Sequence, residues 1–543
     1  MTNAFRRLRL RLSVIALCLA AVDFRVSAAI FEPINPLGCS YASLREAVTT
    51  GGFYRFTCNA TIEIPATLIV SKRLYLDAAG HDVTLSGGGL HQILVVQFGV
   101  ACELRGIRLR DGVAQRGGAI SSRGGELTLR DVRFENNLAQ GVSSAGTEGL
   151  GGAIDNMGGT INALRCQWTG NLARGGDGLV LSEQPSSVRF GATSARAGAI
   201  YNDRGVVQLV DCQFVSNAAQ GGRGMSEPFQ HRGADASGGA IESSGQLDVV
   251  GCTFSGNEAR GGEGRFSGSF AYSGSGQGSG GAMANHGVLT ALNSTWYRNT
   301  VTARLESLPQ GPLGEGQAAP HRGGALFSDS ESNTVSIVHA TFVGNVAAES
   351  FGSRPGNGGA IASDHSSVRI SRSVFAHAAG SSNFAGTVID VGYNLSSDDS
   401  GHLQAGGSRS GLDPRLGTLE DNGGPTWTVS LLADSPAIDA APHSEFVVTD
   451  QRGVSRPQGV GFDLGAFERR NTSSALVLRW VRILPPNGVL EVVSTPGARL
   501  QLFAARELKG PWTLAAEAMA DAQGRAVIET ALAGPGCFFR VSQ

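Results

Sequence analysis

Charged residues are scarce in this 543-residue chain, since Asp, Glu, Lys and Arg make up 17% of it, against about 25% in an average soluble domain. Lysine occurs only at Lys72 and Lys509, so arginine supplies nearly all of the positive charge. The formal net charge is −2. Proteins that bind nucleic acid need at least a basic face. The composition therefore argues against a nucleic-acid partner.

Long apolar runs are missing beyond the N-terminal region. No stretch after residue 28 approaches the roughly 18 consecutive apolar residues of a membrane-spanning helix, so we expect no transmembrane span. Residues 1–28 have the composition of a signal peptide: four arginines at 6, 7, 9 and 11, then the apolar segment 14–22 and the small-residue sequence Val26-Ser27-Ala28. We therefore expect an exported protein that is extracellular or at the cell surface.

Cysteine is also sparse. Cys39 and Cys58 flank the first predicted helix, and in an oxidising compartment we predict that they form a disulfide. Cys166, Cys212 and Cys252 share one position of the repeat described below, where a thiol acts as a small buried hydrophobe. No histidine or fourth ligand converges with these three residues, so we expect no metal site and no cofactor.

Glycine, in contrast, is abundant, and it marks a motif that occurs seven times. Two small residues, an alanine and an aliphatic residue begin at 117, 151, 197, 238, 280, 323 and 358. Each aliphatic residue is followed 13 to 16 positions later by an aromatic: Phe134, Trp168, Phe214, Phe254, Trp296, Phe342 and Phe375. Repeats at this period are typical of solenoids.

The residues before each aromatic alternate as a half-buried strand does. Positions seven and five before it are apolar, as in Leu127 and Leu129, and the position between them is mostly polar. The position two before it is always small, and this odd step predicts a bend between two strands. We therefore predict an all-β fold, a solenoid of short parallel strands in which stacked coils bury continuous ladders.

Two polar columns are predicted to be structural. Six aromatics are followed three residues later by asparagine, at 137, 171, 217, 257, 299 and 345. A second column lies two residues after each motif aliphatic: Ser122, Asn156, Asn202, Ser243, Asn285, Ser328 and Ser363. Such side chains bond backbone at tight turns, and identical amides bond one another along a stack. Trp168 and Trp296 are likewise predicted to be core residues rather than platforms for sugar rings.

Insertions fall between an aromatic and the next motif, so they emerge from one edge of the solenoid. They occupy residues 140–150, 174–196, 220–237, 260–279 and 300–322. Two interpretations stay open: the insertions form a binding surface, or they are flexible loops without a binding role. Three of them contain Gly-Gly-x-Gly sequences, at 175–178, 221–224 and 261–264, which resemble calcium-binding nonapeptides but lack their later Asp. We predict turns there.

Three resemblances follow from these motifs. The paired GGA[aliphatic] and FxxN motifs resemble the passenger repeats of the polymorphic outer-membrane protein family, which are right-handed parallel β-helices implicated in adhesion. The sequence CSYASLREA at 39–47 is similar to the CSLREA module. Segments 413–417, 422–426, 435–439, 450–453 and 463–468 resemble the choice-of-anchor Q region. These resemblances imply an extracellular right-handed parallel β-helix of the pectin-lyase-like type, and they imply no reaction.

The two ends differ from the repeats. Ser43-Leu44-Arg45-Glu46 matches a capping box, and Leu44, Ala47 and Val48 form one apolar stripe, so a short helix is predicted to cover the open end of the solenoid. After residue 470, five short strands separated by turns predict a small antiparallel β module, which resembles terminal modules of bacterial exported proteins. The expected divisions are 1–28 signal peptide, 29–60 cap, 61–410 β-helix, 411–470 anchor-Q-like end and 471–543 β module.

Catalytic residues are not evident. The columns on either side of the small position do not align acids: Asp131, Arg165, Asp211, Gly251, Asn293, His339 and Arg372 on one side, and Arg133, Gln167, Gln213, Thr253, Thr295, Thr341 and Val374 on the other. Asp439, Asp450, Arg452, Arg456, Asp463 and Glu468 are expected to form a polar network that closes the last coil.

The expected function is thus non-enzymatic: a secreted or surface scaffold that binds a polysaccharide or a cell-surface protein through the loops on one edge. The alternative is a polysaccharide lyase or glycoside hydrolase, which would be favoured if carboxylates and an arginine met in a cleft. No catalytic residue, metal ligand or cofactor-binding residue is assigned, and the sequence leaves the oligomeric state open.

Overall fold

The structure is a computed structural model of the full chain. It describes residues 34–180, 189–225, 232–264, 266–267, 271–272, 275–305, 321–329, 334–348, 358–444, 446–470, 477–484, 487–493, 499–505, 513–519, 521, 525–531 and 538–542. The chain divides into two compact units, one ending at Glu468 and one beginning at Arg469. No helix in the described residues is long and apolar enough to cross a membrane.

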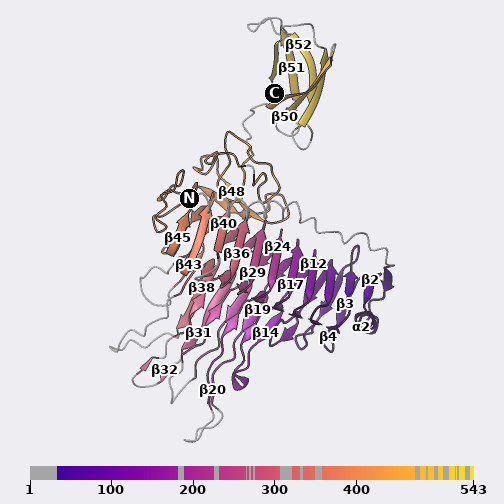
Figure 1. Ribbon diagram of the computed structural model, residues 1–543, viewed down its shortest axis with the longest axis vertical. Helices are drawn as coiled ribbons and strands as arrows, with labels where there is room; N and C mark the ends of the chain where they lie inside the picture. The colour runs from indigo at the N-terminus through magenta and orange to yellow at the C-terminus, as the bar shows by residue number, and fades with distance from the viewer. Residues whose placement is uncertain are drawn as a thin grey trace. The chain divides into compact units, whose positions relative to one another are not determined.

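The first unit is a parallel β-helix, as predicted, and Figure 1 shows its coils stacked side by side. Sheet A contains two strands from most coils: β1 (Asn35–Leu37), β2 (Gly52–Phe56), β4 (Leu68–Val70), β5 (Leu74–Asp77), β7 (Leu94–Val96), β8 (Ala101–Arg105), β11 (Ile120–Arg123), β12 (Glu126–Arg130), β16 (Ile154–Met157), β17 (Thr160–Leu164), β23 (Ile200–Asp203), β24 (Val206–Val210), β28 (Ile241–Ser243), β29 (Gln246–Val250), β35 (Met283–Asn285), β36 (Val288–Leu292), β39 (Leu326–Ser328), β40 (Thr334–Val338), β43 (Ile361–Ser371) and β45 (Phe384–Asp390).

Two further sheets complete each coil. Sheet B contains β3 (Ala60–Glu63), β6 (Val83–Ser86), β9 (Ile107–Arg110), β13 (Arg133–Glu135), β18 (Gln167–Thr169), β25 (Gln213–Val215), β30 (Thr253–Ser255), β37 (Thr295–Tyr297), β41 (Thr341–Val343), β44 (Val374–Ala376) and β46 (Leu395–Ser396). Sheet C contains β10 (Val113–Ala114), β14 (Leu138–Gln140), β19 (Leu172–Arg174), β26 (Ala218–Gln220), β31 (Glu258–Gly264), β38 (Thr300–Leu305) and β42 (Val346–Ala347).

The predicted ladders fill the interior. The seven aromatics are buried and stack in a row, and ring centroids of neighbours lie 4.5 to 5.5 Å apart. Trp168 and Trp296 are therefore core residues, as expected. Each coil contributes one ring at the equivalent position of the repeat. The rings therefore stack into an apolar column that no single coil could bury.

The asparagine ladder is confirmed. Asn217 Nδ2 donates to the backbone oxygen of Trp168 at 2.9 Å and to Asn257 Oδ1 at 3.0 Å, and its Oδ1 accepts from Asn171. The second polar column is also buried, and Asn156 Nδ2 donates to Asn202 Oδ1 at 2.8 Å. These amides satisfy backbone groups at two corners of each coil.

The predicted bend between sheets A and B has a left-handed backbone. The residue before the small position has positive φ in all seven repeats: Asp131, Arg165, Asp211, Gly251, Asn293, His339 and Arg372. Four members of this column are Gly, Asn or Asp, which adopt this conformation most easily, so the backbone of the bend accounts for much of its composition.

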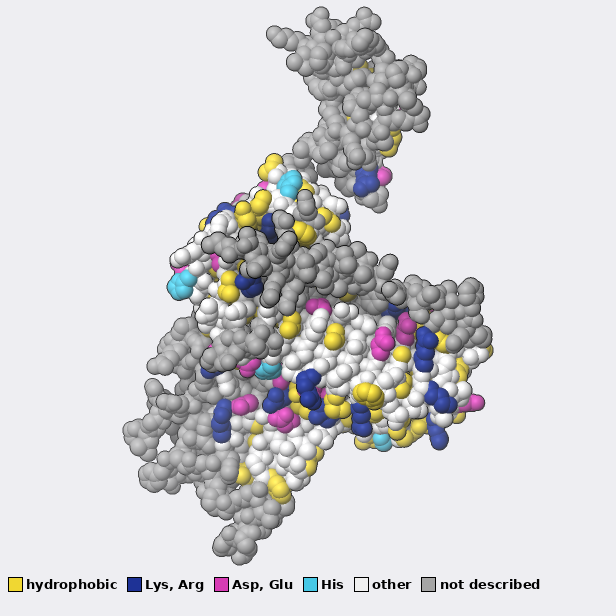
Figure 2. Space-filling model, viewed as in Figure 1, with side chains coloured by type: hydrophobic (Ala, Val, Ile, Leu, Met, Phe, Trp, Pro, Cys, Tyr) yellow, Lys and Arg dark blue, Asp and Glu magenta, His cyan; other side chains and the backbone are white. Residues whose placement is uncertain are grey.

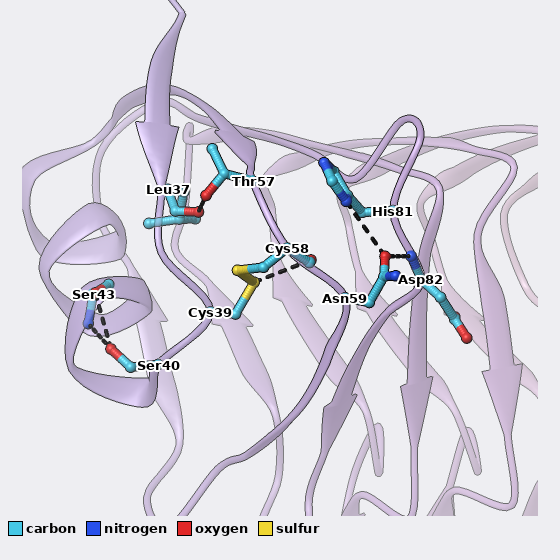
Figure 3. The surroundings of a disulfide bond; sticks show 9 residues. All are labelled: Leu37, Cys39, Ser40, Ser43, Thr57, Cys58, Asn59, His81 and Asp82. Carbon is cyan, nitrogen blue, oxygen red and sulfur yellow. Dashed lines mark hydrogen bonds between the residues drawn. A yellow bond between two sulfur atoms is a disulfide. The ribbon is translucent and has the colours of Figure 1, made fainter.

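The N-terminal end is covered by helix α2 (Tyr41–Thr50), whose Leu44, Ala47 and Val48 join the core. The N-cap is Ser40, which accepts from the backbone N–H of Ser43, so the capping-box prediction placed the helix start one turn too late. Cys39 and Cys58, with Cα atoms 6.1 Å apart, form a disulfide that links the start of this helix to the turn after β2 (Figure 3).

The insertions form a second layer at one edge. Sheet D contains β15 (Gly149–Leu150), β22 (Ala195–Arg196), β27 (Ala236–Ser237) and β34 (Gly278–Ser279), and it packs on sheet C through small side chains: Ala139, Ala173, Ala195, Ala219 and Ala236. Two hairpins, β20 (Leu179–Val180) with β21 (Arg189–Phe190) and β32 (Phe266–Ser267) with β33 (Ala271–Tyr272), and a 3-10 helix, η1 (Ser143–Ala145), belong to the same insertions. We call sheets C and D together the fin.

The turn prediction for the Gly-Gly-x-Gly sequences is wrong. Residues 261–264 belong to strand β31, and Gly222 donates its N–H to Thr193 and accepts from Ala234 across the fin. A Cβ atom built on Gly222 would lie 2.0 Å from the backbone oxygen of Gly176. Glycine is therefore required because two backbone layers touch.

Residues 411–468, which we call the strap, return across the outer face of sheet B. The strap contains one hairpin, β47 (Leu416–Glu420) with β48 (Thr428–Leu431). The expected polar network is present, with Arg456 Nη1 2.8 Å from Glu468 Oε2 and both side chains fully buried. The network lies against the bend between β36 and β37 rather than at the end of the last coil, since Arg456 also bonds Asn293 Oδ1.

The second unit has two antiparallel sheets that share a core around Leu490 and Leu502. One contains β49 (Val477–Leu484), β50 (Asn487–Val493) and β53 (Arg525–Ala531), and the other β51 (Arg499–Ala505), β52 (Thr513–Met519) and β54 (Phe538–Ser542). The predicted strands match except for β52, which the sequence analysis missed. Its sequence TLAAEAM is rich in residues that strands disfavour, so pairing with β51 decides its structure.

Candidate functional site

A charged groove lies where sheet D meets the outer face of sheet A. Its volume is about 400 Å³, and its lining is Ser194, Arg196, Asp235, Ala236, Ser237, Gln277, Ser279, His286, Arg322, Phe327, Asp329 and Asp364. Sheet A supplies the floor and the fin supplies one wall. Figure 2 shows basic, acidic and histidine side chains gathered over the middle coils of this face.

Glu242 is buried next to the groove and contacts three of its lining residues, Arg196, Ser237 and His286. It follows the motif aliphatic on β28, its side chain is 2% exposed, and Arg196 Nη1 lies 3.0 Å from its Oε1. Its other oxygen accepts a hydrogen bond from Ser237. Burial alone would raise the pKa of Glu242, but the hydrogen bond from His286 and the charge of Arg196 outweigh burial and lower it. Glu242 is therefore an ionised carboxylate.

His286 bridges two carboxylates on different coils. Its Nε2 lies 3.5 Å from Glu242 Oε1, and its Nδ1 lies 2.6 Å from Asp329 Oδ1. Burial would lower the pKa of His286, but these two partners raise it to about 10. The imidazole is thus a fixed cation at neutral pH and a poor proton acceptor.

The remaining charges are paired as well. Arg322 forms an ion pair with Asp364, and Arg196 Nε lies 3.2 Å from Glu148 Oε2. Towards the N-terminal coils, Arg116 binds Asp155 through two hydrogen bonds of 2.9 and 3.0 Å. The pairs therefore continue along the solenoid axis from the coil of β11 to that of β43.

This site was not predicted from the sequence, because its residues lie in other columns of the repeat than the two that flank the small position. Arg116, Arg196 and Arg322 each stand directly before a repeat motif, and Asp155 and Glu242 directly follow a motif aliphatic. Both positions point out of the coil on the edge that carries the insertions. Aligning the residues that flank the GGA motif, instead of those near the aromatic, would have revealed the alternation of charge.

The outward row on sheet B that begins with Arg133 and Gln167 is partly covered by the chain itself. Thr253 Oγ1 donates to the backbone oxygen of Trp427 at 2.6 Å, Thr295 Oγ1 donates to Gln451 Oε1 at 2.7 Å, and Thr341 Oγ1 accepts from the N–H of Ala466. The strap therefore covers the C-terminal half of this row and removes it as a binding surface.

Sheet A displays a second row beside the groove. The outward residue at the centre of each longer strand is polar in six successive coils: Thr128, Asn162, Gln208, Asp248, Thr290 and Ser336. These residues pair in register, so their spacing is the strand separation of about 4.8 Å. Hydroxyls and amides at such a repeat can bond a chain of hydroxyl groups laid along the axis.

In the described part of the chain, no group of three or more His, Cys, Asp or Glu side chains could hold a metal ion. Cys166, Cys212 and Cys252 are buried free thiols in one column. Burial raises the pKa of Cys166 and of Cys212 well above the ordinary thiol value, which keeps both protonated.

No protein-family model matches this chain, and no curated protein matches it either.

Proposed function

We propose that this protein is an exported β-helix that binds an extended polysaccharide along the outer face of sheet A, in the groove beside the fin. The observation that carries the proposal is the network of Arg196, Glu242, His286 and Asp329, which fixes polar groups of four coils in one orientation. Preorganised polar groups in a concave site lose little entropy when a ligand binds.

The fold supports an extended rather than a compact ligand. The ion pairs and the row of hydroxyls and amides run parallel to the solenoid axis, and each coil repeats similar chemistry about 4.8 Å further on. A polymer with repeating hydroxyl groups can match such a repeat over several coils. Several weak contacts on one chain add through their effective concentration.

The proposal is tested by a glycan array with the full chain and two variants. Ser279→Trp puts a bulky side chain into the groove and leaves its ion pairs in place. Gln167→Trp makes the same type of change on the outer face of sheet B, at an equally half-buried position. We expect binding to fall at least tenfold in Ser279→Trp only. Equal binding by both variants would refute the groove as the site.

A second candidate function is glycoside hydrolysis. Asp329 and Asp364 directly follow the paired residues Ser328 and Ser363, so their backbones lie on adjacent coils about 4.8 Å apart, near the carboxyl separation of about 5 Å in retaining glycosidases. Both are ion-paired, which disfavours the protonated acid that hydrolysis needs. Release of reducing ends that Asp329→Asn and Asp364→Asn both abolish would establish hydrolysis.

A further inference from the structure

The charge balance of the groove indicates what kind of polysaccharide it accepts. Its described lining contains three cations, Arg196, His286 and Arg322, and three carboxylates, Asp235, Asp329 and Asp364, and the buried Glu242 lies beneath them. With the charged neighbours that pair with this lining, Glu148 with Arg196 and Arg232 with Asp235, five carboxylates face four cations. A site that recognises anionic groups needs positive charge in excess.

Each cation is already engaged. Arg196 contacts Glu148 and Glu242, with its guanidinium 3.2 Å from the first carboxylate and 3.0 Å from the second. His286 is held between Glu242 and Asp329. A uronate or sulfate group could bind one of these cations only by displacing a resident carboxylate, and a displaced carboxylate next to Glu242 would repel its new neighbours.

Arg322 and Asp364 show the same pairing at the other end of the groove, where a second hollow of about 230 Å³ adjoins it. That hollow is lined by the same two charged residues and by Ala362, Ala385 and Gly386. It contributes no additional cation. The pairing therefore extends along the described length of the groove.

We infer that the groove selects an uncharged polysaccharide and rejects polyuronates and sulfated glycans. This inference rests on the proposed function and adds the ligand class. Paired side chains keep lone pairs and N–H groups that hydroxyls can bond, as at Arg196, whose side chain is 39% exposed. Hydroxyl groups can share these donors and acceptors without breaking an ion pair.

The test compares polymers that differ only in charge. Polygalacturonate, alginate and hyaluronan are each immobilised as the native polyanion and as the carboxyl-reduced neutral polymer, beside unsubstituted glucans, galactans and mannans. We expect the full chain to bind neutral polymers at least tenfold more tightly than native polyanions. Its affinity should change less than twofold between about 0.05 and 0.5 M salt, because no net charge is neutralised on binding.

A variant pair tests the cause. Asp364→Asn leaves Arg322 without its groove partner and should raise affinity for the native polyanions about fivefold, with a new salt dependence. Asp434→Asn removes the partner of Arg415 in an exposed pair of the strap and serves as the control, with no gain expected.

The outcomes separate the two proposals. Preferential, salt-sensitive binding of polyanions by the unmodified chain would overturn the ligand class and leave the proposed function standing. Binding of none of the polymers would overturn the proposed function, and the ligand class with it.

Discussion

The asparagine ladder can be tested by removing one member, in Asn217→Ala. The side chain is fully buried and takes part in four hydrogen bonds, two accepted from Asn171 and one donated to each of Trp168 and Asn257. At about 1 kcal/mol net for each bond, the loss is about 4 kcal/mol. Alanine also leaves the buried backbone N–H of Asn171 without its acceptor, so the loss in the free energy of unfolding should be larger than this value.

Urea unfolding followed by far-UV circular dichroism measures this loss, provided the denaturant slope stays unchanged. Gln213→Ala is the control, since it lies on the same coil and its side chain points out of the solenoid. Truncation there should change stability by about 0.5 kcal/mol or less. If the free energies of unfolding of Asn217→Ala and Gln213→Ala differ by less than about 1 kcal/mol, the ladder is not a source of stability and the reasoning fails.

Three further predictions concern the bend, the strap and the fin. Burial raises the pKa of Asp211 to about 6, above its value in the unfolded chain, so ionisation of this carboxyl lowers the stability of the fold as pH rises from about 4 to about 6. In urea titrations, Asp211→Asn should therefore be more stable than the parent at pH 7.5 and equally stable near pH 4. Arg456→Met leaves the buried Glu468 without its cation and should destabilise the strap by about 3 to 5 kcal/mol, measured as faster proteolysis within residues 411–468. Adding Glu468→Leu should recover part of this loss of stability, and no recovery would contradict the ion-pair argument. Gly222→Ala should lower stability by about 1 to 3 kcal/mol because its Cβ would meet the Gly176 oxygen, whereas Gly191→Ala, which has open space, should unfold at the urea concentration of the parent.

Much of the solenoid could be predicted because its determinants repeat. The aromatic column, both polar columns and the bend each recur seven or nearly seven times, so register between coils follows from one-dimensional spacing. The stripe of Leu44, Ala47 and Val48 likewise identified the capping helix, although the competition between Ser40 and Ser43 for the N-cap was decided by the fold. Ser40 precedes the helix in the extended conformation that a cap needs.

The groove, the strap and the fin depended on contacts between segments whose spacing is irregular. Thr253 and Gln451 are 198 residues apart, and nothing in either local sequence indicates their hydrogen bond. Gly222 lies in a segment that looks like a turn until a neighbouring backbone is placed against it. The ion pairs of Glu242 likewise form only when three coils stack. Sequence alone thus determined the repeating interior, because burial and hydrogen bonding act there on identical neighbours. Tertiary structure decided the exterior, where each contact joins unlike residues that only the finished stack brings together.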